Sequence, residues 1–306
     1  MELNNTMRHL IVGATLTATC LFSTLSFAGA YDDGLAAYQA GDHHKALGLF
    51  FALAQQGDTT AEFNLGVMYQ NGQGVARNEA EAAAWYRKAA EMGHANAQNN
   101  LAALYEAGQG VSQSNVEAAE LYHQAAEAGV GRAQYNLALM YSSGRGVVQD
   151  YSQAAKWYRK AAEQGRTTAQ NNLGALYEAG LGVARDDQEA ARWYRKAAEQ
   201  GDDRAQYNLG MIYTKGSAIA QNYDEAAKWL SKAAEQGSAQ AQVALGSMYE
   251  NGQGVHQSLA EASKWWQKAI VTAHDDSSNE GQEARTLAAA SLDRNNLQVS
   301  LLSTLK

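Results

Sequence analysis

The histidine, cysteine and serine residues of this chain do not occur at the spacings typical of a metal site or a catalytic nucleophile. His43 and His44 are adjacent, and neighbouring residues on a helix point about 100° apart, so the pair cannot share a metal without further ligands. No His-x-x-x-His, Cys-x-x-Cys or Gly-x-Ser-x-Gly spacing occurs. The sequence therefore indicates no metal site, no cofactor and no covalent nucleophile.

Carboxylates are the remaining candidates for catalysis. Glu106, Glu178 and Glu250 recur at intervals of 72 residues, and a paired acid and base formed across such positions stays open from sequence alone. A group that recurs along the chain is, however, more typical of a surface than of a single active site. The Gly-x-Gly pairs close predicted helices, whereas a phosphate-binding loop follows a strand and opens a helix.

These side chains lie on a repeat of 36 residues. Six copies run without interruption, each opened by an alanine, over residues 61–96, 97–132, 133–168, 169–204, 205–240 and 241–276. A fixed period of this length is typical of a stacked array, in which each repeat packs on its neighbours. We therefore expect one solenoid over residues 61–276 instead of one compact core.

Each repeat reads as two helices. In the third repeat Ala133, Leu137 and Met140 form an apolar stripe on the first helix, and the spacing predicts a second helix over 151–163 that buries Trp157 and Tyr158. Gly-x-Gly-Val follows the first helix in most copies, where glycine suits a chain that leaves a helix through positive φ.

The pattern A-x-x-x-L-[GA]-x-x-Y-x-x-G-x-G-V, followed by A-A-x-W-Y-x-K-A-A-E-x-G, resembles the Sel-1-like repeat family, a relative of the tetratricopeptide repeats. The resemblance covers most of the chain. It implies an all-α fold, a right-handed α-solenoid superhelix of antiparallel helix pairs, with a concave groove lined by the first helices. It also implies an adaptor or scaffold more often than an enzyme.

Both ends depart from the repeat. Residues 1–30 read as an export signal, with an apolar run over 10–22 and cleavage after Ala28 or Ala30; this predicts a periplasmic or secreted protein with no stable membrane span after cleavage. Cys20, the single cysteine, lies in that signal. Residues 31–60 predict a divergent helix pair that caps the array, and residues 277–306 predict a capping helix over 280–294, with Leu287 facing inward, and a tail.

The net charge of −8 argues against a nucleic-acid partner, because phosphate binding needs clustered Lys and Arg. The Arg-Lys pairs at 87–88, 159–160 and 195–196 are each followed by a glutamate, and we interpret them as solvated helix faces.

The third, seventh and tenth positions of each repeat are expected opposite the buried stripe of the first helix. Aromatic side chains alternate with asparagine at the third position, and the fourth carries a row of asparagines. The predicted groove residues are Phe63, Asn64, Asn100, Tyr135, Asn136, Asn172, Tyr207 and Asn208. Two readings of the asparagine row stay open: each amide bonds a backbone group of the adjoining helix, or it holds a bound peptide backbone, as the equivalent residue does in the tetratricopeptide domains that this pattern resembles.

Aromatic rings with amides between them suit an extended polypeptide, and a glycan could stack on the same rings. The leading hypothesis is an exported scaffold that binds a protein or peptide segment in its groove without catalysis. The alternatives are an enzyme or activator directed at the cell wall, acting on peptidoglycan or a β-lactam, and an array that binds through its convex face.

Overall fold

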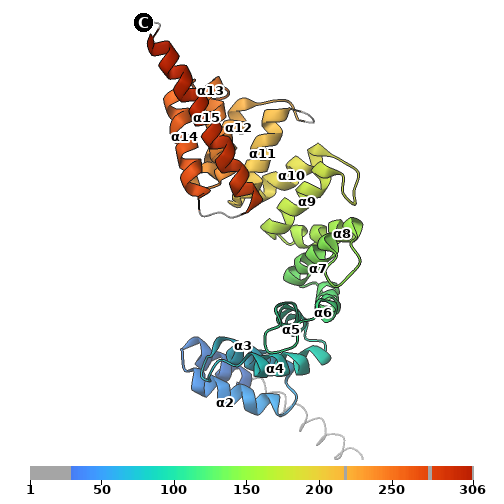
Figure 1. Ribbon diagram of the computed structural model, residues 1–306. Coiled ribbons are helices and arrows are strands. Elements are labelled where there is room, and N and C mark those ends of the chain that lie inside the picture. The colour runs from blue at the N-terminus through green and yellow to red at the C-terminus, as the bar shows by residue number, and fades with distance from the viewer. Residues whose placement is uncertain (1–28, 217–218, 275–277, 305–306) are drawn as a thin grey trace, which may run out of the picture. The chain divides into compact units, whose positions relative to one another are not determined.

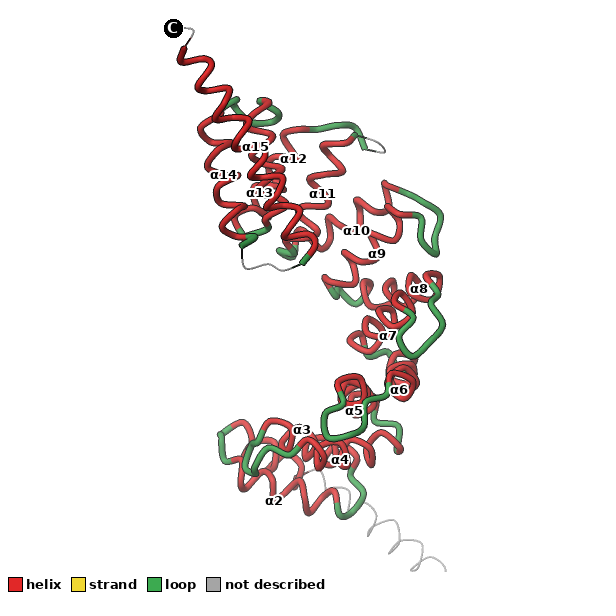
Figure 2. The backbone as a smooth tube through the Cα atoms, in the orientation of Figure 1, coloured by secondary structure: helices red, strands yellow, loops and turns green. Residues whose placement is uncertain are grey.

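The computed structural model describes residues 29–216, 219–274 and 278–304, with side chains as far as residue 296. These residues form helices joined by turns and short loops, and none of them lies in a β-strand (Figure 2). The chain divides into two compact units, Met1–Gln149 and Asp150–Lys306. Residues 1–28 of the signal predicted over residues 1–30, with Cys20, lie outside the described part of the chain.

The helices pair in chain order. In the first unit a helix over residues 29–39 is followed by α2 (His43–Ala54), α3 (Thr59–Asn71), α4 (Glu79–Glu91), α5 (Ala95–Ala107), α6 (Asn115–Glu127) and α7 (Gly131–Ser143). The second unit contains α8 (Tyr151–Glu163), α9 (Thr167–Ala179), α10 (Asp187–Glu199), α11 (Asp203–Lys215), α12 (Tyr223–Glu235), α13 (Ala239–Asn251), α14 (Leu259–Thr272) and α15 (Asn279–Thr304). Within each unit, helices adjacent in sequence pack against each other (Figure 1). The all-α solenoid of antiparallel helix pairs is confirmed.

Small and aromatic side chains together build the core of each repeat. In α7 the predicted stripe of Ala133, Leu137 and Met140 is at most 1% exposed, and Trp157 and Tyr158 on α8 are buried as predicted. Alanines allow the helix backbones to approach, and the rings fill the space that remains, as close packing of an interior requires.

The first glycine of the Gly-x-Gly pair ends a helix, and the second lets the loop that follows pack against an earlier helix. Gly72 terminates α3 in the left-handed region at φ 71°, a conformation that costs a glycine little. Gly74 also has positive φ, and a Cβ there would collide with the backbone of His43 at the start of α2. The second glycine therefore allows the loop of one repeat to lie directly on the preceding helix pair.

A glutamine at the second position links successive helices. Gln98 Nε2 on α5 donates to the carbonyl of Ala90 at 3.2 Å, and the same bond to the carbonyl eight residues earlier is made by Gln134, Gln170, Gln206 and Gln242. In the first repeat this position is Glu62, whose Oε2 is buried without a hydrogen-bond partner. Burial raises the pKa of Glu62 because it disfavours the charged form. The positive charge of nearby Lys88 offsets this rise only in part.

The C-terminal helix is longer than the predicted 280–294 segment. It packs against α13 and α14 and buries Ala284 and Ala288, whereas Leu287 is 51% exposed. The prediction that Leu287 faces inward is therefore wrong in part. Leu287 lines an open pocket between α15 and the last repeats and is not enclosed in the core.

Candidate binding surface

All the predicted groove residues lie on the first helices and are half-buried. They are Phe63 and Asn64 on α3, Asn100 on α5, Tyr135 and Asn136 on α7, Asn172 on α9, and Tyr207 and Asn208 on α11. None is sealed in the core, so each keeps some surface that a ligand could contact. The seventh position is open in two repeats, where Ala103 and Ala175 are exposed.

The expectation that the third position faces outward in every repeat is wrong for two of them. Asn99 is 4% exposed and Asn171 9% exposed, because each amide bonds to another asparagine. Asn99 Nδ2 donates to Asn100 Oδ1 at 3.1 Å, and Asn208 Nδ2 donates to Asn171 Oδ1 at 3.1 Å. The bond satisfies one group of each amide, while Asn99 Oδ1 is buried without a hydrogen-bond partner. The aromatic rings at this position stay half-buried instead.

Four asparagines of the row, Asn64, Asn100, Asn136 and Asn208, bond to side chains and not, as one reading expected, to backbone groups of the adjoining helix. Asn64 Nδ2 donates to the Tyr31 hydroxyl at 3.2 Å. Asn100 and Asn136 bond to the hydroxyls of Tyr86 and Tyr122 on the second helices of the preceding repeats. The row therefore has a structural role in joining repeats, since each bond crosses from one helix pair to the next.

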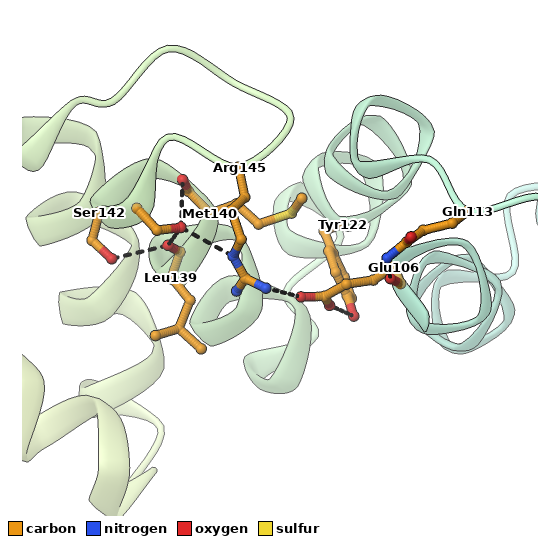
Figure 3. Close-up of polar contacts among 8 residues, drawn as sticks. Glu106, Gln113, Tyr122, Leu139, Met140, Ser142 and Arg145 are labelled. Carbon is orange, nitrogen blue, oxygen red and sulfur yellow. Dashed lines mark hydrogen bonds and ion pairs between the residues drawn. The ribbon is translucent and has the colours of Figure 1, made fainter. Parts of the chain in front are cut away.

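Each recurring glutamate is held by a cation, and two of the three are also held by a tyrosine. Glu106 accepts from the Tyr122 hydroxyl at 3.1 Å and from Arg145 Nη1 at 2.7 Å (Figure 3). Glu178 accepts from Tyr194 at 3.0 Å and Lys215 at 3.2 Å, and Glu250 from Arg294 at 3.3 Å. Each pair joins a repeat to the next helix pair or to α15. This engagement gives the three glutamates a structural role, which the recurrence alone did not reveal.

The buried tyrosines of this network resist ionisation. Burial raises the pKa of Tyr86 to about 12, and its bond from Asn100 opposes this rise. Burial also raises the pKa of Tyr122 and Tyr194, and the neighbouring Glu106 and Glu178 raise it further, because a second negative charge would repel the first.

An apolar pocket of about 220 Å³ lies in the first unit. We call it the N-terminal pocket; it is lined by Leu35, Tyr38, Phe50, Phe63, Asn64 and Val67. Phe63 also stacks on His94, with 4.7 Å between ring centroids. The helix over residues 29–39 contributes one wall, and the Tyr38 hydroxyl donates to Gln73 Oε1 at 2.8 Å.

A larger pocket of about 340 Å³ lies in the second unit, between α11, α12, α13 and α15. In this C-terminal pocket the apolar lining comes from Tyr207, Met211, Leu230, Val243, Met248 and Leu287, and Glu280 and Glu283 on α15 lie at its edge. Tyr207 and Met211 occupy the third and seventh positions of their repeat. Burial raises the pKa of Tyr207, and the charges of Glu283, Glu280 and Glu178 raise it further. The sequence analysis found Tyr207 but not the two glutamates.

The basic side chains of the second helices pack on aromatic rings, so the interpretation of these pairs as solvated helix faces is incomplete. Lys88 Nζ lies 4.0 Å from the centroid of the Trp85 ring, and Arg87 Nη2 donates to the Tyr105 hydroxyl at 3.2 Å. Lys196 lies 4.1 Å from the Trp193 ring centroid. Such contacts are typical of cations that stabilise helix packing.

Two classes of site are absent from the described residues. No group of three or more His, Cys, Asp and Glu side chains is placed there to hold a metal ion. No helix in the same residues is both long and apolar enough to cross a membrane.

The repeats match a known family. The model of the Sel1 repeat matches residues 59–94, 95–130, 131–165, 167–202, 203–238 and 239–270. The chain belongs to the Sel1 repeat family. Each match begins at the first helix of a pair, two residues or so before the alanine used to number the repeats above. Sel1 repeats generally mediate protein–protein interaction and generally form non-catalytic scaffolds.

Solved structures support the same fold. The chain is similar to a Sel1 repeat protein from Oxalobacter formigenes, with 34% identity and a TM-score of 0.68 over 78% of this chain and 96% of the other. It also resembles a protective antigen of uropathogenic Escherichia coli with an SLR fold, with 33% identity and a TM-score of 0.58 over 90% of this chain and 68% of that one. A rat protein described as DAP3-binding cell death enhancer 1 is 43% identical over 49 residues, which is 10% of its length.

Proposed function

We propose that this Sel1 repeat protein is an exported scaffold that binds an extended segment of a partner polypeptide along its first helices. The observation that carries the proposal is the state of the eight predicted groove residues, which are all half-buried and none sealed. Half-buried aromatic rings offer contact area with little loss of side-chain freedom, and the amides beside them can bond to a peptide backbone. Export rests on the signal predicted over residues 1–30.

The structural bonds of the asparagines do not conflict with a second role. The Asn64 side chain offers two donors and one acceptor, and its bond to Tyr31 uses one donor. The same argument applies to Asn208, which donates to Asn171. An amide that is held in place by one bond presents its remaining groups in a fixed direction, which lowers the entropy lost when a ligand binds.

A photo-crosslinking experiment tests which face binds. A benzophenone amino acid is placed at Ala103 or Ala175, the exposed seventh positions of first helices, and, as matched controls, at Glu163 or Glu199, which are exposed on second helices. The exported chain is irradiated in intact cells. We expect covalent adducts with a polypeptide from Ala103 and Ala175 only. Adducts from Glu163 and Glu199 alone would instead assign binding to the convex face, and adducts that contain glycan without peptide would reject a polypeptide ligand.

A turnover assay separates the scaffold from an enzyme. The purified mature chain is incubated with peptidoglycan and with a chromogenic β-lactam. We expect no turnover above buffer, since Glu106, Glu178 and Glu250 are already held by cations.

A further inference from the structure

The C-terminal pocket combines an apolar interior with carboxylates that no cation neutralises. Within the described part of the chain, the side chains of Glu280 and Glu283 form no ion pair and no hydrogen bond, and both residues are exposed. The glutamates at the tenth repeat position, in contrast, are each paired with a cation. Arg204 lines an adjoining recess with Glu280 without pairing with it.

We infer that the C-terminal pocket binds a segment of a partner polypeptide in which a bulky apolar side chain stands next to lysine or arginine. This inference rests on the proposed function and adds the chemistry of the partner. The apolar side chain enters the pocket, and the neighbouring cations meet the two carboxylates on α15.

The interior of the pocket suits an apolar side chain. Its volume of about 340 Å³ is at the lower end of the roughly 300–1,000 Å³ typical of ligand sites, so it suits side chains of a peptide more than a large cofactor. Met211 and Met248 contribute flexible thioethers, which adapt to apolar groups of different shape. Tyr207 adds one half-buried ring that can pack on an aliphatic or aromatic partner.

The edge of the pocket suits cations. Glu280 and Glu283 are three residues apart on α15, so their side chains share one face of the helix. Both act on Tyr207, whose pKa is raised by their charges as well as by burial, which places the negative potential at the pocket itself. Bringing a carboxylate-bearing ligand here would cost free energy through like-charge repulsion, whereas a lysine or arginine would relieve it.

Polar groups inside the pocket can bond to the backbone of the segment. The side-chain amides of Gln240 and Gln253 line it, and each offers two donors and an acceptor. In the first repeat the residue equivalent to Gln253 is Gln73, which accepts from Tyr38 and is therefore already engaged. The same position is thus used for folding at one end of the array and lies open to a ligand at the other.

A peptide selection tests the inference with the mature chain, residues 31–306, immobilised and exposed to a display library of random twelve-residue peptides. We expect the enriched peptides to carry a large apolar residue beside Lys or Arg. Binding of a synthetic enriched peptide should then weaken by about tenfold in Glu280→Lys/Glu283→Lys and weaken with added salt. The control Asp293→Lys makes the same type of charge reversal on an exposed site of α15 outside the pocket and should leave binding unchanged.

A second pair of variants tests the interior. Ser247→Phe places a ring in the pocket, and Ala290→Phe, the matched control, adds the same ring at an exposed site of α15 outside the pocket. Circular dichroism confirms that each variant is folded. We expect Ser247→Phe to lose peptide binding and Ala290→Phe to keep it.

Three results would overturn the inference. Enriched peptides without a basic bias, or binding unaffected by both Glu280→Lys/Glu283→Lys and Ser247→Phe, would reject this pocket while leaving the proposed function in place. A selection that yields no binding peptide, together with no adducts from Ala103 or Ala175, would reject the proposed function as well.

Discussion

The two end pockets are built from the same repeat positions, yet they differ in polarity. Phe63 and Val67 in the N-terminal pocket occupy the third and seventh positions of the first repeat, as Tyr207 and Met211 do in the fifth. The N-terminal cap adds Leu35 and Tyr38, which make its pocket apolar, whereas α15 adds two carboxylates to the C-terminal one. The repeats therefore supply the hollow, and the non-repeating elements at each end determine what it can bind.

The largest loss of stability is expected from removing a buried aromatic ring at either end of the array. Phe50 is 1% exposed and lines the N-terminal pocket, and Trp266 is fully buried in the last repeat. Phe50→Ala or Trp266→Ala should each cost about 3–5 kcal/mol of local stability through lost burial and an unfilled cavity. Because repeats contact mainly their neighbours, hydrogen exchange should rise over α2 and α3 in the first variant and over α13 and α14 in the second. Uniform exchange along the chain would contradict independent ends.

Alkali should affect the two ends unequally. Tyr86 and Trp266 occupy the same repeat position, and only the tyrosine can ionise. The pKa of Tyr86 is raised to about 12 in the folded chain against roughly 10 in the unfolded chain. The buried, neutral hydroxyl of Tyr86 therefore makes its full contribution to the free energy of unfolding below pH 10. It is lost as the pH rises from 10 to 12, by up to about 2 kcal/mol. Urea unfolding at pH 8 and pH 11 should show a smaller difference for Tyr86→Phe than for the wild type. An equal difference in both would show that Tyr86 ionises normally.

The smallest effect concerns the glutamine bond that the first repeat lacks. Glu62→Gln should raise the free energy of unfolding by about 1 kcal/mol at pH 7, since an amide can donate where an ionised carboxylate cannot. The sign follows from the raised pKa of Glu62. At a pH above the ordinary pKa of a glutamate, the folded chain must bury a charged carboxylate, and the variant removes this unfavourable free energy. In acid, where the carboxyl is protonated in both states, the gain should shrink.

The mirror variant is Gln242→Glu in the last repeat. Gln242 is 0% exposed and donates to Ala234 at 3.0 Å, so a carboxylate there loses the bond and is buried. Denaturation should show destabilisation by about 2 kcal/mol or more. If Glu62→Gln also destabilised the chain, the assignment of the glutamine bond as the missing element would fail.

The sequence predicted the repeated helices because periodicity is a local property. Ala133, Leu137 and Met140 formed the expected stripe, and Gly72 ended α3 as the glycine pattern indicated. The burial of Asn99 and Asn171 was missed, because it depends on the residues that the two amides bond to. The partner of Asn99 lies on the same helix and that of Asn171 on a later one. The pattern of asparagine beside asparagine in alternate repeats was the one available signal.

The residues of the candidate site that lie on repeats were predicted, and those that lie on the C-terminal helix α15 were missed. Tyr207 was found from its position in the repeat, but Glu280 and Glu283 belong to a helix whose docking on α13 and α14 depends on packing far along the chain. The sequence shows these two glutamates three residues apart, just before Ala284. Only the fold places them near Tyr207.

The ion pairs of Glu106, Glu178 and Glu250 recur in every second repeat, with a consequence for how such an array can change length. Duplication of a glutamate-bearing repeat would leave one carboxylate facing a neighbour with no cation, and duplication of a cation-bearing repeat would leave one cation with no carboxylate. Gain or loss of 72 residues preserves the alternation. Evolution and engineering should therefore lengthen or shorten this protein in steps of two repeats.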